Sequence, residues 1–124
     1  MSLFKFTKAI LTSKKINLFN NGNHVRDFTY IDDAIDAIIK LIYKPPRTKT
    51  PYVIYNIASS NPINIKFYLK TIEEIVGKKA KIKFKSLQKG DVFKTHGSIK
   101  LLQKKIYFNP KKNIVEGIKK FVQW

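Results

Sequence analysis

The chain has 124 residues, the length of one modest domain, and carries 25 basic against 8 acidic side chains, a net charge of +17. Its hydrophobic fraction of 44% is ordinary for a folded protein and excludes global disorder. The lack of cysteine excludes disulfides, thiolate zinc sites and cysteine nucleophiles, and no apolar run reaches the length of a membrane span. Because the first residues also lack the pattern of a signal peptide, we expect a cytoplasmic protein that does not bind membranes.

The positive charge is almost entirely lysine, with 23 lysines and only two arginines, Arg26 and Arg47. Proteins that bind phosphates or bases favour arginine, because its guanidinium forms two parallel hydrogen bonds. The lysines of this chain are instead scattered over unrelated segments. Lys, Ile, Asn and Phe also share AT-rich codons, so genome composition explains the profile better than nucleic-acid binding does. A small lysine-rich nucleic-acid-binding protein remains one alternative hypothesis.

Hydrophobic spacing predicts an amphipathic helix at residues 2–14, followed by two short strands on either side of an Asn-Gly turn. The strands are expected at residues 16–19 and 25–29. Residues 31–43 form the clearest helix, with acidic side chains in its first turn. Its apolar residues cover most of the circumference, which predicts burial on more than one side. A proline pair and a polar linker follow this helix.

The second half of the chain continues the alternation of strands and helices. Residues 52–58 (YVIYNIA) form a nearly continuous apolar run, typical of a strand covered on both faces in a parallel sheet. The later expected elements are a short pairing segment at 63–65, a helix at 66–76 closed by Gly77, a lysine-faced strand at 80–85, a short helix at 98–104 and a helix at 114–124 capped by Asn113. This pattern predicts an α/β fold without a second complete domain.

Residues suited to catalysis are scarce. The two histidines, His24 and His96, lack metal-ligand spacing and are expected to be exposed loop residues. The carboxylates that open the long helix are expected to stabilise its N-terminus rather than bind a metal. Tyr107 and Lys111 have the Y-x-x-x-K spacing of a proton-transfer pair, but Pro110 between them disfavours the helical turn that such a pair needs. We therefore predict no catalytic residue and no metal site.

Three loop segments carry functional signals. In the first, Arg26 lies beside a glycine turn at the entry to a helix, a place that suits a diphosphate; the alternative is that Arg26 merely pairs with Asp27 or Asp91. The second, residues 88–92, is a glycine turn with a carboxylate able to hold a sugar hydroxyl. The third is the end of the apolar run at 52–58, because α/β proteins bind ligands at the C-terminal ends of parallel strands.

Five stretches of sequence form a specific combination: MSLFKFTKAI, GNHVRDFTYIDD, YVIYNIASSNPINI, LQKGDVFKT and NPKKNIVEGIKKFVQW. In this order they resemble the C-terminal part of extended short-chain dehydrogenase/reductases, and most of all the UDP-glucuronate 4-epimerases. The likeness rests on the family patterns G-x-x-x-R-D-F-x-Y-x-x-D, Y-N-I-G-x-x-x-P, Q-x-G-D-V-x-x-T and P-x-x-x-x-x-E-G-[IV]-x-x-F-x-x-W. Such enzymes are often encoded with surface-polysaccharide biosynthesis genes.

The resemblance implies a set of residue roles. In that family NAD takes a hydride from C4 of the sugar and returns it to the other face, and the C-terminal half clamps the nucleotide. Arg26 is then expected to contact the diphosphate of a UDP-sugar, and Asp91 the ribose region. Gln88 stands where related epimerases place a second arginine, and Phe28 and Tyr30 are expected to shape the pocket or pack beside it.

The resemblance also implies one partial domain over residues 1–124, the substrate-binding portion of an extended Rossmann-type epimerase without the N-terminal dinucleotide-binding half. Met1 coincides with an internal residue of the family, so we expect a truncated or split gene product. Such a chain would bind a UDP-sugar, would bind no NAD by itself and would be inactive alone. A split epimerase that needs a separately encoded Rossmann half is the second alternative hypothesis.

Overall fold

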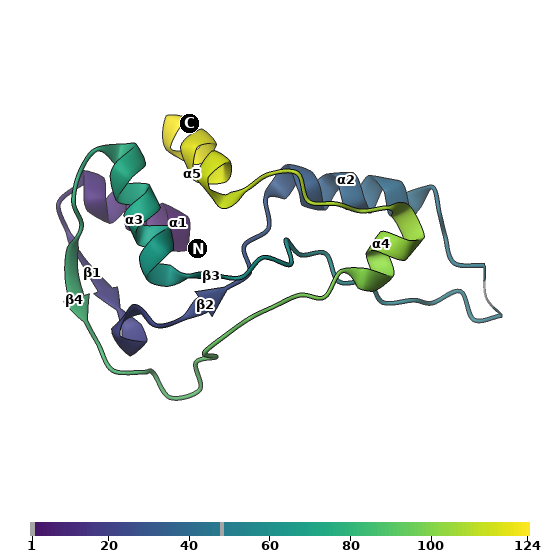
Figure 1. Ribbon diagram of the computed structural model, residues 1–124, viewed down its shortest axis with the longest axis horizontal. Helices are drawn as coiled ribbons and strands as arrows, with labels where there is room; N and C mark the ends of the chain where they lie inside the picture. The colour runs from purple at the N-terminus through teal and green to yellow at the C-terminus, as the bar shows by residue number, and fades with distance from the viewer. Residues whose placement is uncertain (1, 48) are drawn as a thin grey trace.

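A computed structural model describes residues 2–47 and 49–124; Met1 and Thr48, the latter in the expected linker, lie outside the described residues. Helices and short strands alternate along an elongated molecule (Figure 1). In chain order the elements are α1 (Ser2–Leu11), β1 (Lys15–Leu18), the 3₁₀ turn η1 (Phe19–Gly22), β2 (Val25–Arg26), α2 (Ile31–Ile42), β3 (Ile63–Asn64), α3 (Ile65–Val76), β4 (Lys81–Phe84), α4 (Lys100–Ile106) and α5 (Ile114–Gln123).

One half of the molecule, which we call the three-helix region, consists of α1, α3, α5 and the strand pair β1–β4 (Figure 1). Helix α3 packs against both α1 and α5, and β1 runs parallel to β4 with Lys15 opposite Lys81 and Leu18 opposite Phe84. The buried core of this region comprises Ile10, Ile16, Leu18, Ile65, Tyr68, Leu69, Ile72 and Ile118. Half of these residues come from the apolar face of α3, which is covered by α1 and α5.

The ends of the helices in this region follow the signals in the sequence. The Asn64 side chain accepts a hydrogen bond of 2.7 Å from the backbone N–H of Lys66, and Gly77 ends α3 with a left-handed φ of 73°. The Asn113 side chain likewise accepts a hydrogen bond of 2.9 Å from the N–H of Glu116 at the start of α5. The predicted caps Gly77 and Asn113 are therefore confirmed, and the structure adds Asn64 as the N-terminal cap of α3.

The other half, the two-helix region, holds α2 and α4 at the far end of the molecule (Figure 1). Its smaller buried core consists of Ala37, Ala58, Ile99, Leu102, Ile106 and Phe108. Helix α2 buries only Asp33 and Ala37. Its exposed apolar residues are Ile31, Ile35, Ile38, Ile39 and Ile42, which follow helical spacing and which we call the α2 stripe. The sides of this helix that its apolar residues suit for burial are therefore left largely uncovered in the described chain.

The strand predicted at residues 52–58 does not form in the described chain. The segment is irregular, and Tyr52, Val53 and Ile54 are exposed. A strand forms only when a neighbour pairs with its backbone, and among the described residues no strand lies beside this segment. The parallel pairing expected here occurs instead between β1 and β4.

Two smaller expectations need correction. Helix α1 ends at Leu11 rather than at residue 14, because Ser13 adopts a left-handed φ of 56° and turns the chain into β1. Strand β4 lies within the predicted 80–85 range, but all four of its residues are exposed, so its apolar face is not buried as the alternation of lysines predicts. Across residues 2–47 and 49–124, α2 and α3 are the longest helices, with 12 residues each, and no helix is long and apolar enough to cross a membrane.

Candidate functional site

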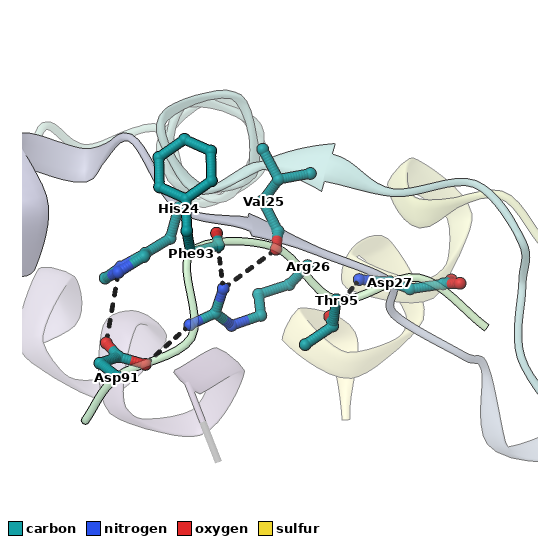
Figure 2. A network of polar contacts seen from close by, with 7 residues as sticks. All are labelled: His24, Val25, Arg26, Asp27, Asp91, Phe93 and Thr95. Carbon is teal, nitrogen blue, oxygen red and sulfur yellow. Dashed lines mark hydrogen bonds and ion pairs between the residues drawn. The ribbon is translucent and has the colours of Figure 1, made fainter.

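Strand β2 brings together loops that are far apart in the sequence. On one edge it pairs antiparallel with β3, with Arg26 opposite Ile63. On the other edge, the N–H of Val25 donates to the carbonyl of Phe93 (3.0 Å), and the N–H of Thr95 donates to the carbonyl of Val25 (3.1 Å). The glycine-turn loop of residues 88–92 is thereby held next to the R-D-F signature (Figure 2).

The guanidinium of Arg26 lies at the centre of this site (Figure 2). Its Nη2 donates to Asp91 Oδ1 at 3.0 Å, and its Nη1 donates to the carbonyls of Val25 (3.0 Å) and Phe93 (3.1 Å). The side chains of Arg26 and Asp91 are 24% and 31% exposed, so the ion pair is only partly screened by water. These contacts use three of the five N–H donors of the guanidinium, and the remaining donors can bind an anion.

The sequence left two roles open for Arg26, a diphosphate anchor or a partner of Asp27 or Asp91. The structure pairs it with Asp91. Asp27 instead joins two other segments, because its carboxylate accepts hydrogen bonds from the Ser59 hydroxyl and from the Gly97 N–H (3.0 Å). The Asp27 N–H also donates to Thr95 Oγ1 at 3.1 Å. Asp27 therefore ties the end of the 52–58 segment to the loop that follows Asp91.

His24 corrects a prediction, because it is buried rather than exposed, with 6% of its surface accessible. Its Nε2 lies 3.3 Å from Asp91 Oδ2, within ion-pair distance, although the two groups are not oriented as a hydrogen bond. His24 and Arg26 flank Val25, and side chains two residues apart in an extended chain point to the same side. This spacing was the signal in the sequence that could have linked His24 to the site. His96 is exposed, as expected, with its Nε2 3.2 Å from Ser60 Oγ.

The remaining candidate site residues, Gln88, Phe28 and Tyr30, lie around the Arg26–Asp91 ion pair. Gln88 is exposed, and its carbonyl accepts from the Asp91 N–H (3.1 Å) in a turn closed by Gly90, whose φ is 84°. Phe28 stacks on Tyr68 with ring centroids 4.2 Å apart. Tyr30 precedes α2, and its ring lies beneath Lys120 Nζ at 5.6 Å. The structure thus joins Arg26 and Asp91 directly, while the two aromatic residues pack against the helices.

Phe28 and Tyr30 line a mainly apolar cavity of about 360 Å³ between α1, α3, α5 and the start of α2. Tyr68 lies at its floor. Burial raises the pKa of Tyr68 to about 12, and a hydrogen bond with the Ser2 side chain partly offsets this shift. The phenol therefore remains neutral near neutral pH and acts as a packing group.

The Y-x-x-x-K pair lacks the geometry of a proton-transfer site. Tyr107 follows α4 with a left-handed φ of 53° and is 84% exposed. The backbone N–H of Lys111 donates to Asp33 Oδ1 in an irregular segment, so the two residues do not share a helical turn. Within the described residues no group of three or more His, Asp or Glu side chains could hold a metal.

The glycines of this chain do not fit a dinucleotide. Binding of NAD needs a glycine-rich turn between a strand and a helix, where backbone N–H groups reach the pyrophosphate. Gly22 lies in η1 between two strands, Gly77 ends α3, Gly90 closes a surface turn and Gly117 lies inside α5. At Gly97 an added Cβ would clash with the Cβ of Ala58, so the lack of a side chain allows two chain segments to pack closely there.

Comparison with known proteins supports the resemblance read from the sequence. Residues 1–58 match the family model "NAD dependent epimerase/dehydratase family". All of this chain aligns at 38% identity with a UDP-glucuronate 4-epimerase of Thermodesulfobacterium geofontis, over 37% of that protein. The chain spans about two fifths of the length of the curated relatives it matches.

The fold is similar to that of solved epimerases. A UDP-glucose 4-epimerase of Thermotoga maritima, solved with UDP-glucose, superposes with a TM-score of 0.87 at 26% identity, covering 99% of this chain and 38% of that one. A UDP-glucuronic acid 4-epimerase of Bacillus cereus, solved with NAD, superposes with a TM-score of 0.83 at 23% identity, covering 99% and 37%. The chain is therefore similar over its whole length to UDP-glucuronate 4-epimerases of the NAD-dependent epimerase/dehydratase family, with a coverage consistent with their C-terminal part.

Proposed function

We propose that this chain is the nucleotide-sugar-binding portion of an NAD-dependent sugar 4-epimerase, and that Arg26 anchors the diphosphate of a UDP-sugar. The observation that carries the proposal is the position of the Arg26 guanidinium. It is fixed by two backbone carbonyls and Asp91 and still has unused donors at a partly exposed surface. A preoriented guanidinium of this kind suits a diphosphate, because little side-chain entropy is lost on binding.

Titration of UDP-glucose into the full chain by calorimetry tests this role. The variant Arg26→Ala removes a charge-assisted contact that contributes about 1.5–3 kcal/mol, so its affinity should fall by about ten- to a hundredfold. Arg47→Ala is the matched control, because it removes the only other arginine, which lies exposed in a surface linker. Equal affinities of wild type and Arg26→Ala for UDP-glucose would show that Arg26 does not contact the diphosphate.

Asp91 has two possible relations to the nucleotide. In our proposal its carboxylate accepts a hydrogen bond from the ribose, with Gln88 and the exposed turn around it close to the same part of the ligand. Asp91→Ala should then weaken binding of UDP-glucose. A gain in affinity would instead mean that Asp91 only competes with the diphosphate for Arg26. Phe28 and Tyr30, which line the apolar cavity, are assigned to the support of the site.

We further propose that the chain acts as one partial domain and that catalysis depends on a separately supplied Rossmann half. The described residues offer neither a glycine cradle for NAD nor a helical Tyr-x-x-x-Lys pair. The assay is UDP-glucuronate plus NAD, monitored for the C4 epimer. The chain alone should give no product, and addition of the Rossmann half of a homologous epimerase should restore turnover that Arg26→Ala lowers. Turnover by the purified chain alone would overturn the fragment hypothesis.

A single-stranded DNA probe at the same ionic strength tests the nucleic-acid alternative. Binding through scattered lysines should be weak, steeply salt-dependent and equal in wild type and Arg26→Ala. Tight DNA binding without affinity for UDP-glucose would favour the alternative hypothesis over the nucleotide-sugar site.

A further inference from the structure

The site contains a buried polar group that the proposed function does not use. His24 Nε2 is fully buried and forms no hydrogen bond with another described residue, yet it lies 3.3 Å from Asp91 Oδ2. A buried polar atom without a partner costs free energy, so its position calls for a physical reason. Among the described residues, the acidic side chain within ion-pair distance of His24 is that of Asp91.

Asp91 needs support because of where it lies in the chain. It follows a glycine turn in a stretch whose residues are all exposed, from Lys81 to His96. The nearest backbone attachments of this loop to β2 come after Asp91, at Phe93 and Thr95. Without side-chain contacts the carboxylate would have considerable freedom, and ordering it on ligand binding would cost conformational entropy.

Each carboxylate oxygen of Asp91 faces one of the two residues that flank Val25. Arg26 Nη2 contacts Oδ1 at 3.0 Å, and His24 Nε2 faces Oδ2 (Figure 2). His24 is itself fixed, because its side chain is buried and its carbonyl accepts a hydrogen bond of 2.9 Å from the N–H of Ile65 at the start of α3. The histidine is therefore the rigid member of the pair, whereas Arg26 is the member with donors left for an anion.

We infer that His24 is a positioning residue for nucleotide binding, which holds the Asp91 carboxylate in place while Arg26 engages the diphosphate. The inference rests on the proposed function and adds a third residue to that site. Small rotations of the imidazole and the carboxylate convert the 3.3 Å approach into a hydrogen bond. His24 then keeps the Asp91 carboxylate in place for the ribose, while Arg26 uses its remaining donors for the diphosphate.

The test uses UDP-glucose and a double-mutant cycle in the full chain. His24→Phe keeps a ring but removes the donor, and should weaken UDP-glucose binding about three- to tenfold. His24→Asn keeps a donor and should recover most of that loss. In an Asp91→Asn background, His24→Phe should cost much less, because its effect acts through the carboxylate. Unchanged binding by His24→Phe, or additive effects of His24→Phe and Asp91→Asn, would overturn the inference.

Nuclear magnetic resonance of the imidazole nitrogens separates this inference from the proposed function. The chain has only two histidines, so His96, which lies near Ser60 rather than Asp91, is an internal control. Asp91→Asn should move the Nε2 resonance of His24 and leave that of His96 unchanged, with or without nucleotide. If wild type fails to bind UDP-glucose, the proposed function is wrong, and the inferred role in nucleotide binding fails with it; the imidazole signals then show whether the His24–Asp91 contact itself exists. If the His24 signal does not respond to Asp91→Asn, the contact is refuted even where UDP-glucose binds.

Discussion

Helices α2 and α3 have the same length, 12 residues, and both are amphipathic, but they differ in what lies beside them. Helix α3 in the three-helix region buries Ile65, Tyr68, Leu69, Thr71 and Ile72 against α1 and α5. Helix α2 in the two-helix region leaves its stripe of five isoleucines exposed and buries one alanine and one aspartate. An apolar stripe shows which face of a helix gains from burial, whereas the neighbouring elements decide whether that burial occurs.

The difference between the regions has a physical consequence for the whole chain. Contiguous exposed apolar surface favours association, because burying it releases free energy roughly in proportion to its area. We expect the isolated chain to be poorly stable and to self-associate through the α2 stripe and the exposed apolar side chains of the 52–58 segment, Tyr52, Val53 and Ile54. A sharp, cooperative melting transition from a dilute monomer would contradict this expectation.

The largest effect on the free energy of unfolding is expected from truncating one buried side chain in each of the two cores. Ile72 and Leu102 are both fully buried, one in each region. Ile72→Ala should lower the free energy of unfolding by about 2–5 kcal/mol, because the dense packing around α3 cannot collapse into the cavity. Leu102→Ala should lie at or below the lower end of that range, because α4 is short and its surroundings can relax. Urea unfolding followed by circular dichroism measures both, and equal losses would show that the two cores are equally rigid.

The stability of the three-helix region should depend on pH through the buried phenol of Tyr68. Burial raises the pKa of Tyr68 to about 12 from 10.0, so the folded state favours the neutral phenol. This contribution is fully present below pH 10 and is lost as the pH rises toward about 12, amounting to about 2–3 kcal/mol. Wild type should therefore lose stability more steeply than Tyr68→Phe above pH 10. Parallel curves for the two proteins would contradict the burial of this phenol.

A third prediction concerns the connection between the regions. The Asp33 carboxylate at the start of α2 accepts hydrogen bonds from the N–H groups of Lys111 (3.2 Å) and Lys112 (3.1 Å), just before α5. Asp33→Asn replaces one acceptor oxygen and should cost about 1–3 kcal/mol. The exposed neighbour Asp32, in the same helical turn, provides the control, since Asp32→Asn should cost only a few tenths. Similar losses in both variants would reduce the role of Asp33 to a general helix-terminus effect.

The smallest effect on stability is expected within the α2 stripe. Ile39 is 49% exposed, so Ile39→Gln should change the free energy of unfolding by less than about 0.5 kcal/mol while reducing self-association. Phe67→Gln removes a similarly exposed apolar side chain from α3 and should leave association unchanged. Analytical ultracentrifugation at increasing concentration distinguishes the two. An unchanged association state in Ile39→Gln would show that the chain self-associates through a surface other than the α2 stripe.

The sequence was informative wherever a structural signal is local. Gly77 and Asn113 mark helix ends through backbone angles and hydrogen bonds within a few residues, and the structure confirms both. The R-D-F and G-D-V motifs indicated that Arg26 and Asp91 belong to one site. Their pairing at 3.0 Å bears out that they lie together, although their roles toward a nucleotide remain predictions.

The features that could not be predicted depend on contacts between distant segments. Residues 52–58 have the composition of a buried strand, but a strand exists only with a partner, and the described chain places none beside them. The same reason explains the exposure of the α2 stripe. Among the buried polar groups, His24 illustrates the same limit, because a lone histidine in a loop beside an Asn-Gly turn gives no local sign of burial.

By itself, the sequence determined the α/β alternation, the end of α3 at Gly77, the start of α5 at Asn113, the family resemblance and the residues around which a nucleotide site can be sought. These properties depend on local backbone preferences and short motifs. The tertiary structure decided which apolar faces are covered, that β1 rather than residues 52–58 supplies the parallel pairing, and that His24 lies buried beside Asp91. Burial and long-range hydrogen bonds depend on which segments lie side by side in space, and that arrangement is a property of the folded chain as a whole.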